Sequence, residues 1–210
     1  LPEDAIIASS SSGTPVTKIA SEAKHPERII VGHPFNPAYL LPLIEICGGE
    51  KTDPKVIEAA REFYKMYDKA PCVLHKEKNG FIANRLMHAL WREEIALVTE
   101  GVCSMADADD AWTFGPGIRL AAVGPGMNYE LGGGSLGIKG CGIKFGAMTN
   151  AVFADISDMK KVPDTWPDLS GEEIIKEKAG MPDVIGHTNE EIAAFRDKLI
   201  VDVLKLHHRM

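Results

Sequence analysis

The sequence is poor in several features that mark whole classes of protein. It has only four cysteines, which lie far apart and form no C-x-x-C pair: Cys47, Cys72, Cys103 and Cys141. This pattern predicts neither a disulfide framework nor a metal site, and it favours reduced thiols in a cytoplasmic protein. No run approaches the ~18 apolar residues of a membrane-spanning helix. The first residues also lack the basic segment and apolar run of a signal peptide.

An excess of positive charge is also missing. The chain has 23 Lys and Arg against 30 Asp and Glu, a net charge of -7, and its basic residues are scattered. Such a sequence offers no basic surface to nucleic acid or to anionic lipid, so neither is expected as a partner. What it does have is ordinary globular composition, with 45% hydrophobic residues in a chain of 210, enough for one large or two small cores.

The first part of the sequence predicts a layered α/β fold. Short apolar or β-branched runs bounded by Pro and Gly predict strands, the first of them buried, at residues 5–9, 28–33, 43–47 and 72–75. A cap residue followed by proline predicts a helix at residues 14–23 and another from residue 53 onward. Strands that alternate with helices in this way are typical of an α/β sheet.

After residue 76 the pattern becomes helical. Apolar residues recur at helical spacing over residues 80–101, and capping boxes at 170–173 and 188–191 predict two further helix starts. Residues 132–146 hold seven glycines and residues 162–167 hold two prolines, so both segments are predicted to be loops. The expected domains are therefore residues 1–76, belonging to an α/β domain, and residues 77–210, which are helical.

A histidine and a glutamate on consecutive predicted strands are the main candidates for chemistry. His33 follows an apolar strand, and Glu45 lies between two isoleucines, where an unpaired carboxylate is costly to bury. If the strands are antiparallel neighbours, Glu45 can fix the tautomer of His33 and stabilise the imidazolium that forms when His33 takes a proton. The alternative is a strand-end histidine that is merely solvated.

Two further groups could face the same place. The run Ser-Ser-Ser-Ser-Gly at residues 9–13 follows the first predicted strand, where open α/β sheets bind ligands. A serine turn that caps the next helix would give the same pattern. Asn84 is predicted to lie one turn inside the long helix, where an asparagine lowers helix stability and could face a cleft.

Together these segments resemble the 3-hydroxyacyl-CoA dehydrogenases in order and spacing. The matching motifs are Ser-Ser-Gly at 11–13, His-Pro-Phe-Asn-Pro at 33–37, Pro-Leu-Ile-Glu-Ile at 42–46 and Gly-Phe-Ile-Ala-Asn-Arg at 80–85. The resemblance implies a Rossmann-type NAD-binding α/β domain followed by an all-helical domain that forms a homodimer. It implies an oxidoreductase of fatty acid metabolism that transfers a hydride between a 3-hydroxyacyl-CoA and NAD.

The resemblance also implies roles for individual residues. His33 would be the general base and Glu45 its orienting carboxylate, in a site between the two domains. Ser12 and Asn84 would hold the reacting oxygen of the substrate. Asn36 would be a supporting amide at the substrate.

The sequence departs from the family in its cofactor motif. The fingerprint G-x-G-x-x-G is missing, and the glycine-rich run at 132–137 does not replace it because no strand precedes that run. The resemblance therefore implies that the first part of the NAD-binding domain is absent from this chain, which would be inactive alone. Ser10 stands where the family often has asparagine, and it would lie near the nicotinamide.

The segment at residues 115–125 is more similar to the branch of carnitine and L-gulonate 3-dehydrogenases. That branch implies a small polar 3-hydroxy acid as substrate, and Arg119 could pair with its carboxylate, although an arginine on a helix is more often solvated. Two other hypotheses stay open. One is a non-catalytic structural protein, and the other is a helical dimerisation module that completes the site of a separate nucleotide-binding chain.

Overall fold

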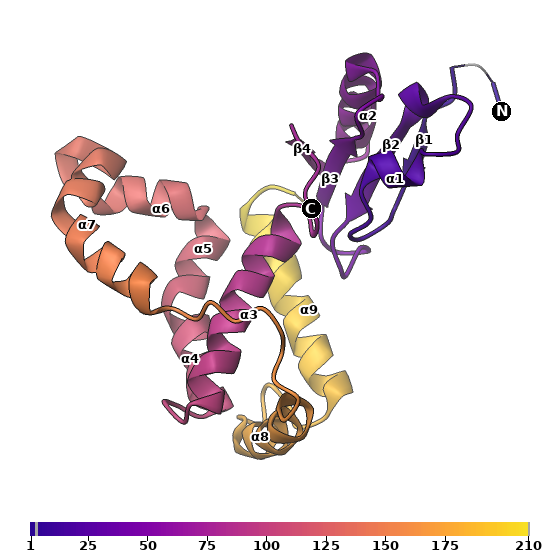
Figure 1. The fold of residues 1–210 in the computed structure, drawn as a ribbon. Coiled ribbons are helices and arrows are strands. Elements are labelled where there is room, and N and C mark those ends of the chain that lie inside the picture. The colour runs from indigo at the N-terminus through magenta and orange to yellow at the C-terminus, as the bar shows by residue number, and fades with distance from the viewer. Residues whose placement is uncertain (3, 210) are drawn as a thin grey trace. The chain divides into compact units, whose positions relative to one another are not determined.

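The computed structural model describes residues 1–2 and 4–209, which divide into two compact units. Unit 1 comprises Leu1–His88 with Arg196–Met210, and unit 2 comprises Ala89–Phe195. Strands occur in the first part of the chain and helices in the rest (Figure 1), so the expected α/β fold followed by a helical part is confirmed. The domain boundary expected at residue 76 stays a prediction, because compact units need not coincide with family domains.

Within its described residues, unit 1 holds a four-stranded sheet in the order β1-β2-β3-β4. The strands are β1 (Ile7–Ser9), β2 (Ile29–Pro34), β3 (Leu43–Gly48) and β4 (Ala70–Leu74). β1 runs parallel to β2, β2 antiparallel to β3, and β3 parallel to β4. The two central strands are rich in isoleucine and valine and are buried, as expected for strands covered on both faces.

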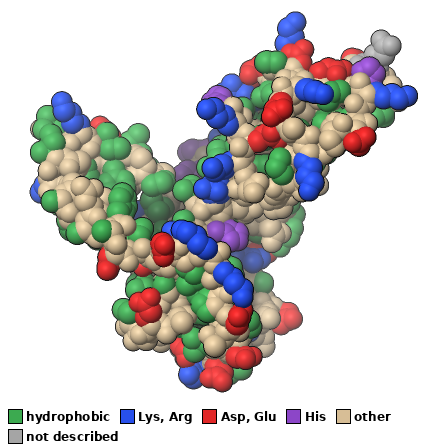
Figure 2. Space-filling view, in the orientation of Figure 1, with side chains coloured by type: hydrophobic (Ala, Val, Ile, Leu, Met, Phe, Trp, Pro, Cys, Tyr) green, Lys and Arg blue, Asp and Glu red, His purple; other side chains and the backbone are tan. Residues whose placement is uncertain are grey.

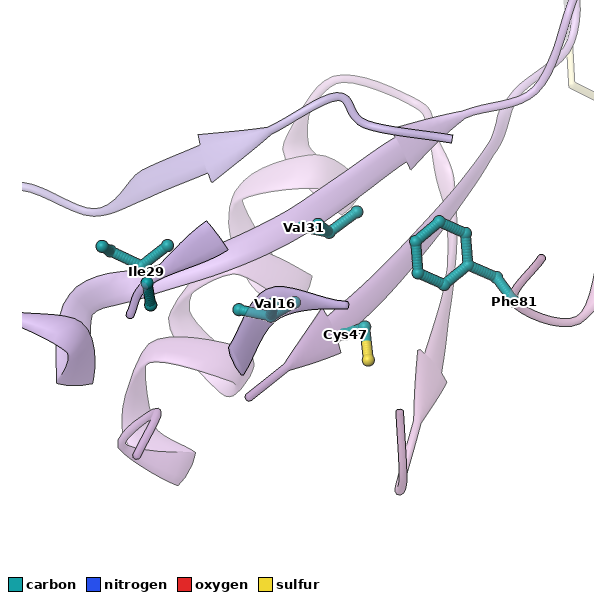
Figure 3. Close-up of a cluster of buried hydrophobic side chains, with 6 residues drawn as sticks. Val16, Ile29, Val31, Cys47 and Phe81 are labelled. Carbon is teal, nitrogen blue, oxygen red and sulfur yellow. The ribbon is translucent and has the colours of Figure 1, made fainter. Parts of the chain in front are cut away.

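Different elements cover the two faces of this sheet. On one face, α2 (Pro54–Met66) packs Ala60 against the isoleucines of β2 and β3. On the other, α1 (Val16–Ile19) and Phe81 form a buried cluster with Ile29, Val31 and Cys47, as Figure 3 shows. The short turn η1 (Pro26–Arg28) leads into β2. Because side chains alternate along a strand, His33 and Glu45 lie on the face that carries Phe81.

Two expectations about this part of the chain are wrong. The first strand was expected to be buried over residues 5–9, but β1 has three residues and Ile7 is 40% exposed. Among the described residues β1 pairs only with β2, so it forms an edge of the sheet with one side open. The helix expected over residues 14–23 is limited to the four residues of α1.

All four cysteines are free, in keeping with the expected thiols. Cys47 is 1% exposed, and burial raises the pKa of its thiol to about 11. A thiol with so high a pKa stays protonated near neutral pH and is a poor nucleophile. Cys47 therefore acts as a small apolar side chain of the core, beside Phe81.

Seven α-helices and two short helical turns follow β4 in the described residues. They are α3 (Ala83–Thr99), α4 (Met105–Trp112), η2 (Thr113–Gly117), α5 (Ile118–Ala122), α6 (Pro125–Gly132), η3 (Gly134–Leu136), α7 (Gly137–Asp155), α8 (Trp166–Gly180) and α9 (Asn189–Leu206). Ile95, Val98, Met105 and Trp166 form the buried cluster of unit 2.

Among the helices that the structure describes, none combines the length and apolarity needed to cross a membrane. Lys and Arg side chains are interspersed with Asp and Glu on the face seen in Figure 2.

The glycine-rich segment at residues 132–146 was expected to be a loop, and this is wrong. Most of it belongs to η3 and to α7, a helix of 19 residues. A Cβ atom on Gly140 would lie 2.8 Å from the Cβ of Leu136, so a glycine is needed where α7 passes the preceding turn. Here tertiary packing outweighs the low helix propensity of glycine.

The two predicted capping boxes have different outcomes. The box at residues 188–191 is confirmed, because Thr188 Oγ1 accepts from the Glu191 N–H at 3.2 Å and Glu191 Oε2 accepts from the Thr188 N–H at 3.0 Å. The box at residues 170–173 lies inside α8, which begins at Trp166. Proline at the second position of α8 starts that helix earlier than the box predicts.

Carboxylates from three helices of unit 2 lie close enough to repel one another: Glu94 on α3, Asp109 on α4 and Glu177 on α8. Burial and then the negative charge of Asp109 raise the pKa of Glu177 to about 7, with smaller effects from Glu94 and Asp110. Burial also raises the pKa values of Asp109 and Glu94. Glu177 binds its proton more tightly in the folded chain, so its stabilising contribution is complete below about pH 4.5 and is lost as the pH rises through about 7.

We expect Glu177→Gln to raise the free energy of unfolding by about 1 kcal/mol at alkaline pH, with almost no change in acid. Glutamine resembles the protonated side chain, and the effect is well below that of the full pKa shift because the carboxyl group is partly open to solvent. Urea unfolding at both pH values measures the difference. Glu172→Gln, an exposed position on the same helix, is the control. An equal gain at both pH values would show that the charge is not the cause.

Candidate active site

A histidine and a glutamate face each other on neighbouring strands. His33 in β2 and Glu45 in β3 are directly opposite in the antiparallel register, and they are 5% and 1% exposed. His33 Nδ1 lies 2.9 Å from Glu45 Oε2, so the expected pairing of strands and side chains is present. An ionised carboxylate only accepts hydrogen bonds, so Nδ1 carries the hydrogen and Nε2 of the neutral imidazole carries a lone pair.

The second oxygen of Glu45 binds the start of a helix. Glu45 Oε1 accepts from the backbone N–H groups of Ile82 and Ala83, at 2.7 and 2.9 Å. These groups stand where α3 begins, and the first N–H groups of a helix have no partner within it and favour a negative charge. The three hydrogen bonds offset the cost of burying the carboxylate. Glu45 thus joins β3, the imidazole and α3 at one point.

The turn before α3 brings its first amides to the sheet. Gly80 and Phe81 have φ values of 76° and 51°, in the left-handed region that glycine adopts freely and phenylalanine rarely does. Phe81 is 2% exposed, and its ring centroid lies 5.2 Å from that of His33. Because of this turn α3 begins only at Ala83, and Asn84 is its second residue. The prediction that Asn84 lies one turn inside the helix is therefore wrong.

The other imidazole nitrogen contacts a serine hydroxyl. Ser12 Oγ lies 3.1 Å from His33 Nε2, and Asn84 Nδ2 donates to Ser12 Oγ at 3.2 Å. With the hydrogen on Nδ1, the Ser12 hydroxyl donates to Nε2 and accepts from Asn84. Asn84, Ser12, His33 and Glu45 therefore form a continuous hydrogen-bonded series, the polar chain, in which every contact has a donor and an acceptor.

The polar chain runs from the core to the surface. His33 and Glu45 are buried, Asn84 is half-buried and Ser12 is exposed. The inner carboxylate orients the imidazole, and the lone pair of Nε2 points toward the exposed hydroxyl. Such an arrangement can accept a proton from an alcohol that approaches Ser12, and the hydroxyl and amide can then donate to the oxygen.

The other predicted site residues lie elsewhere. Ser10 is exposed just beyond β1, and Asn36 is exposed two residues beyond β2. Arg119 is exposed on α5, in unit 2. Among the described residues, the four members of the polar chain contact one another directly. Ser10, Asn36 and Arg119 are not members of the polar chain.

Two features of the site were not predicted from the sequence. The backbone donors of Ile82 and Ala83 hold the buried carboxylate, but backbone groups are independent of residue type. The ring of Phe81 covers one side of the imidazole. The available signal for both was the glycine at the start of the predicted helical stretch, since Gly80 permits the turn that places them.

Comparison with known proteins gives a consistent picture. Residues 1–78 match the model of the 3-hydroxyacyl-CoA dehydrogenase NAD binding domain, and residues 80–164 match that of the C-terminal domain of the same family. The L-carnitine dehydrogenase of a Pseudomonas species is 40% identical over 206 residues, which are 96% of this chain and 61% of that protein. The L-carnitine dehydrogenase of Burkholderia mallei is 51% identical over 136 residues, 65% of this chain and 42% of that protein.

A solved structure extends the likeness to the fold. The crystal structure of FHMPC 5-dehydrogenase, described as an NAD+ dependent dismutase, has a TM-score of 0.78 and 27% sequence identity. The match covers 99% of this chain and 64% of that one. The chain spans 42% to 61% of the length of the two carnitine dehydrogenases named above.

Proposed function

The chain belongs to the 3-hydroxyacyl-CoA dehydrogenase family, and from this premise we propose that it serves the NAD-dependent oxidation of a small polar 3-hydroxy acid of the carnitine type. One observation carries the proposal: an imidazole oriented by buried Glu45 directs Nε2 to the exposed hydroxyl of Ser12. The relatives named L-carnitine dehydrogenase support a polar acid over a coenzyme A thioester.

The proposed mechanism uses His33 as the general base. Nε2 takes the proton of the substrate hydroxyl, and Glu45 stabilises the resulting imidazolium through Nδ1. The Ser12 hydroxyl and the Asn84 amide then donate hydrogen bonds to the oxygen while it becomes a carbonyl. In the reverse direction the imidazolium returns the proton. Two neutral donors suit an oxygen that gains and loses negative charge during the reaction.

The cofactor of the family is NAD, and the residues present fit it. When bound, NAD would supply the acceptor for the hydride that leaves the carbon bearing the hydroxyl. Ser10 offers an exposed, uncharged hydroxyl just beyond the carboxyl end of β1, where open α/β sheets bind ligands. We assign Ser10 to the nicotinamide, Asn36 to support of the substrate and Arg119 to its carboxylate.

The family resemblance also supplies the proposed assembly and location. We propose a cytoplasmic homodimer formed through the helical part, with the domain boundary at residue 76. No nucleic acid or membrane partner is proposed, because the chain carries a net charge of -7.

Substrate preference tests the proposed function. With NAD and a complete NAD-binding domain, we expect the protein to oxidise L-carnitine with a kcat/KM at least ~100-fold above that for 3-hydroxybutyryl-CoA. A site built to pair with a small polar acid leaves its polar groups unpaired when a thioester binds. L-Gulonate serves as a second small polar acid. A preference for the thioester would assign the chain to the fatty acid branch instead, and inactivity toward all three compounds would overturn the proposal.

A further inference from the structure

Two segments of unit 1 lie side by side on the face of the sheet that carries His33. One is residues 12–17 and the other is residues 77–84. At one end Asn84 donates to Ser12 Oγ, at 3.2 Å. In the middle, Val16 and Phe81 belong to the same buried cluster, as Figure 3 shows. At the other end Glu77 accepts two hydrogen bonds from Thr17.

The contact between Glu77 and Thr17 is specific. Glu77 Oε1 accepts from the Thr17 N–H at 2.8 Å, and Oε2 accepts from Thr17 Oγ1 at 2.5 Å. The N–H belongs to the first turn of α1, where backbone donors lack a partner within the helix. Thr17 Oγ1 itself accepts from the Glu50 N–H at 3.0 Å, so the turn after β3 is held at the same point.

The loop that carries Ser12 is otherwise held weakly. Apart from the contacts of Ser12, its hydrogen bonds among the described residues are local, from the Ser11 N–H to Ser9 Oγ at 3.2 Å and from the Thr14 N–H to Ser11 Oγ at 3.4 Å. Such bonds shape the loop but do not fix it to the sheet. Two residues that follow the loop hold its end in place. Val16 is 0% exposed in the core, and Thr17 is hydrogen-bonded to Glu77.

We propose that Glu77 is a positioning residue for the reaction. By holding the first turn of α1, its carboxylate sets the position of the Ser12 hydroxyl relative to His33 Nε2 and Asn84. Glu77 does not touch the polar chain, and it acts through Thr17 and the short segment between Thr17 and Ser12. This inference rests on the proposed function, because it assigns Ser12 to the reacting oxygen.

Three substitutions in the native protein test this role. Glu77→Gln removes the charge. Thr17→Val keeps the side-chain shape but removes the hydroxyl, and with it the hydrogen bonds to Glu77 and from the Glu50 N–H. Thr17→Ser keeps the hydroxyl. We expect the first two to lower kcat for carnitine about 10-fold, with KM changed by less than about twofold, because a displaced donor weakens binding of the transition state more than that of the substrate. Thr17→Ser is expected to keep the kcat of the native protein. Glu22→Gln, at an exposed position near α1, is the charge control.

A second readout is independent of turnover. The 15N chemical shift of His33 Nε2 is expected to move in Glu77→Gln and Thr17→Val as the Ser12 hydroxyl withdraws, and to stay in place in Thr17→Ser and Glu22→Gln. If Glu77→Gln does not fold, the kcat and the 15N shift of Thr17→Val test the positioning role instead. An unchanged kcat and an unchanged shift in Thr17→Val would overturn the positioning role, as would an equal loss in Thr17→Ser. Those results would leave the proposed function standing, because that function is tested separately by substrate preference and by the replacement of His33.

Discussion

Replacing His33 with glutamine is expected to lower kcat for carnitine oxidation by at least ~100-fold, with KM little changed. Glutamine has nearly the same reach and can still hydrogen-bond to Ser12 and Glu45, so the site should keep its shape. Its amide cannot accept a proton, however, so the substrate hydroxyl loses its base. A change in kcat without a change in KM is the mark of an interaction made in the transition state.

Steady-state kinetics with saturating NAD measure this effect. His25→Gln is the matched control, because His25 is exposed and pairs with Glu27 at the surface. We expect that variant to retain the turnover of the native protein. Near-normal turnover in His33→Gln would remove the imidazole from its assigned role and, with it, the mechanism built on the polar chain.

Glu45→Gln is expected to have the second large effect, with kcat lowered on the order of 10³-fold. The amide oxygen of glutamine can still accept from the backbone donors of Ile82 and Ala83. Its NH₂ group then faces His33 Nδ1, so that nitrogen must give up its hydrogen and the hydrogen moves to Nε2. A protonated Nε2 has no lone pair for the substrate. Turning the amide over does not help, because its NH₂ group would then face two N–H donors.

Two measurements separate this explanation from simple unfolding. The 15N shifts of His33 should show the hydrogen on Nε2 in Glu45→Gln and on Nδ1 in the native protein. Thermal unfolding should show a loss of about 1–3 kcal/mol, since a neutral amide replaces the charged carboxylate in three buried hydrogen bonds. Glu58→Gln on the surface of α2 provides the control. A normal kcat together with a lone pair retained on Nε2 would contradict the role assigned to Glu45.

The strand pair that carries His33 and Glu45 could be predicted from the sequence because strand periodicity leaves little freedom. A shift of one residue would turn Glu45 to the apolar face that α2 covers, away from its hydrogen-bond partners, so the cost of burying an unpaired carboxylate sets the register. The helix α7 could not be predicted in this way. Its glycines signal a loop locally, and only close packing against the preceding turn reveals why they are needed.

The side chains of the polar chain could likewise be predicted, but the contacts that hold them could not. Glu77 and Thr17 are 60 residues apart, and neither stands out in sequence, because a charged residue in a polar stretch suits a solvated surface equally well. The amides that bind Glu45 depend on the turn at Gly80 and Phe81. Long-range and backbone contacts of this kind become visible only in three dimensions.

The three hydrogen bonds of Glu45 also bear on how the protein folds. Its partners lie 12 residues away in β2 and 37 and 38 residues away at α3. A chain in which only one of these segments has docked leaves the charge half-compensated in an apolar strand, a state that is disfavoured. Formation of the strand pair and arrival of the helix should therefore be cooperative. The proton acceptor would then be aligned in the same step that completes the first unit.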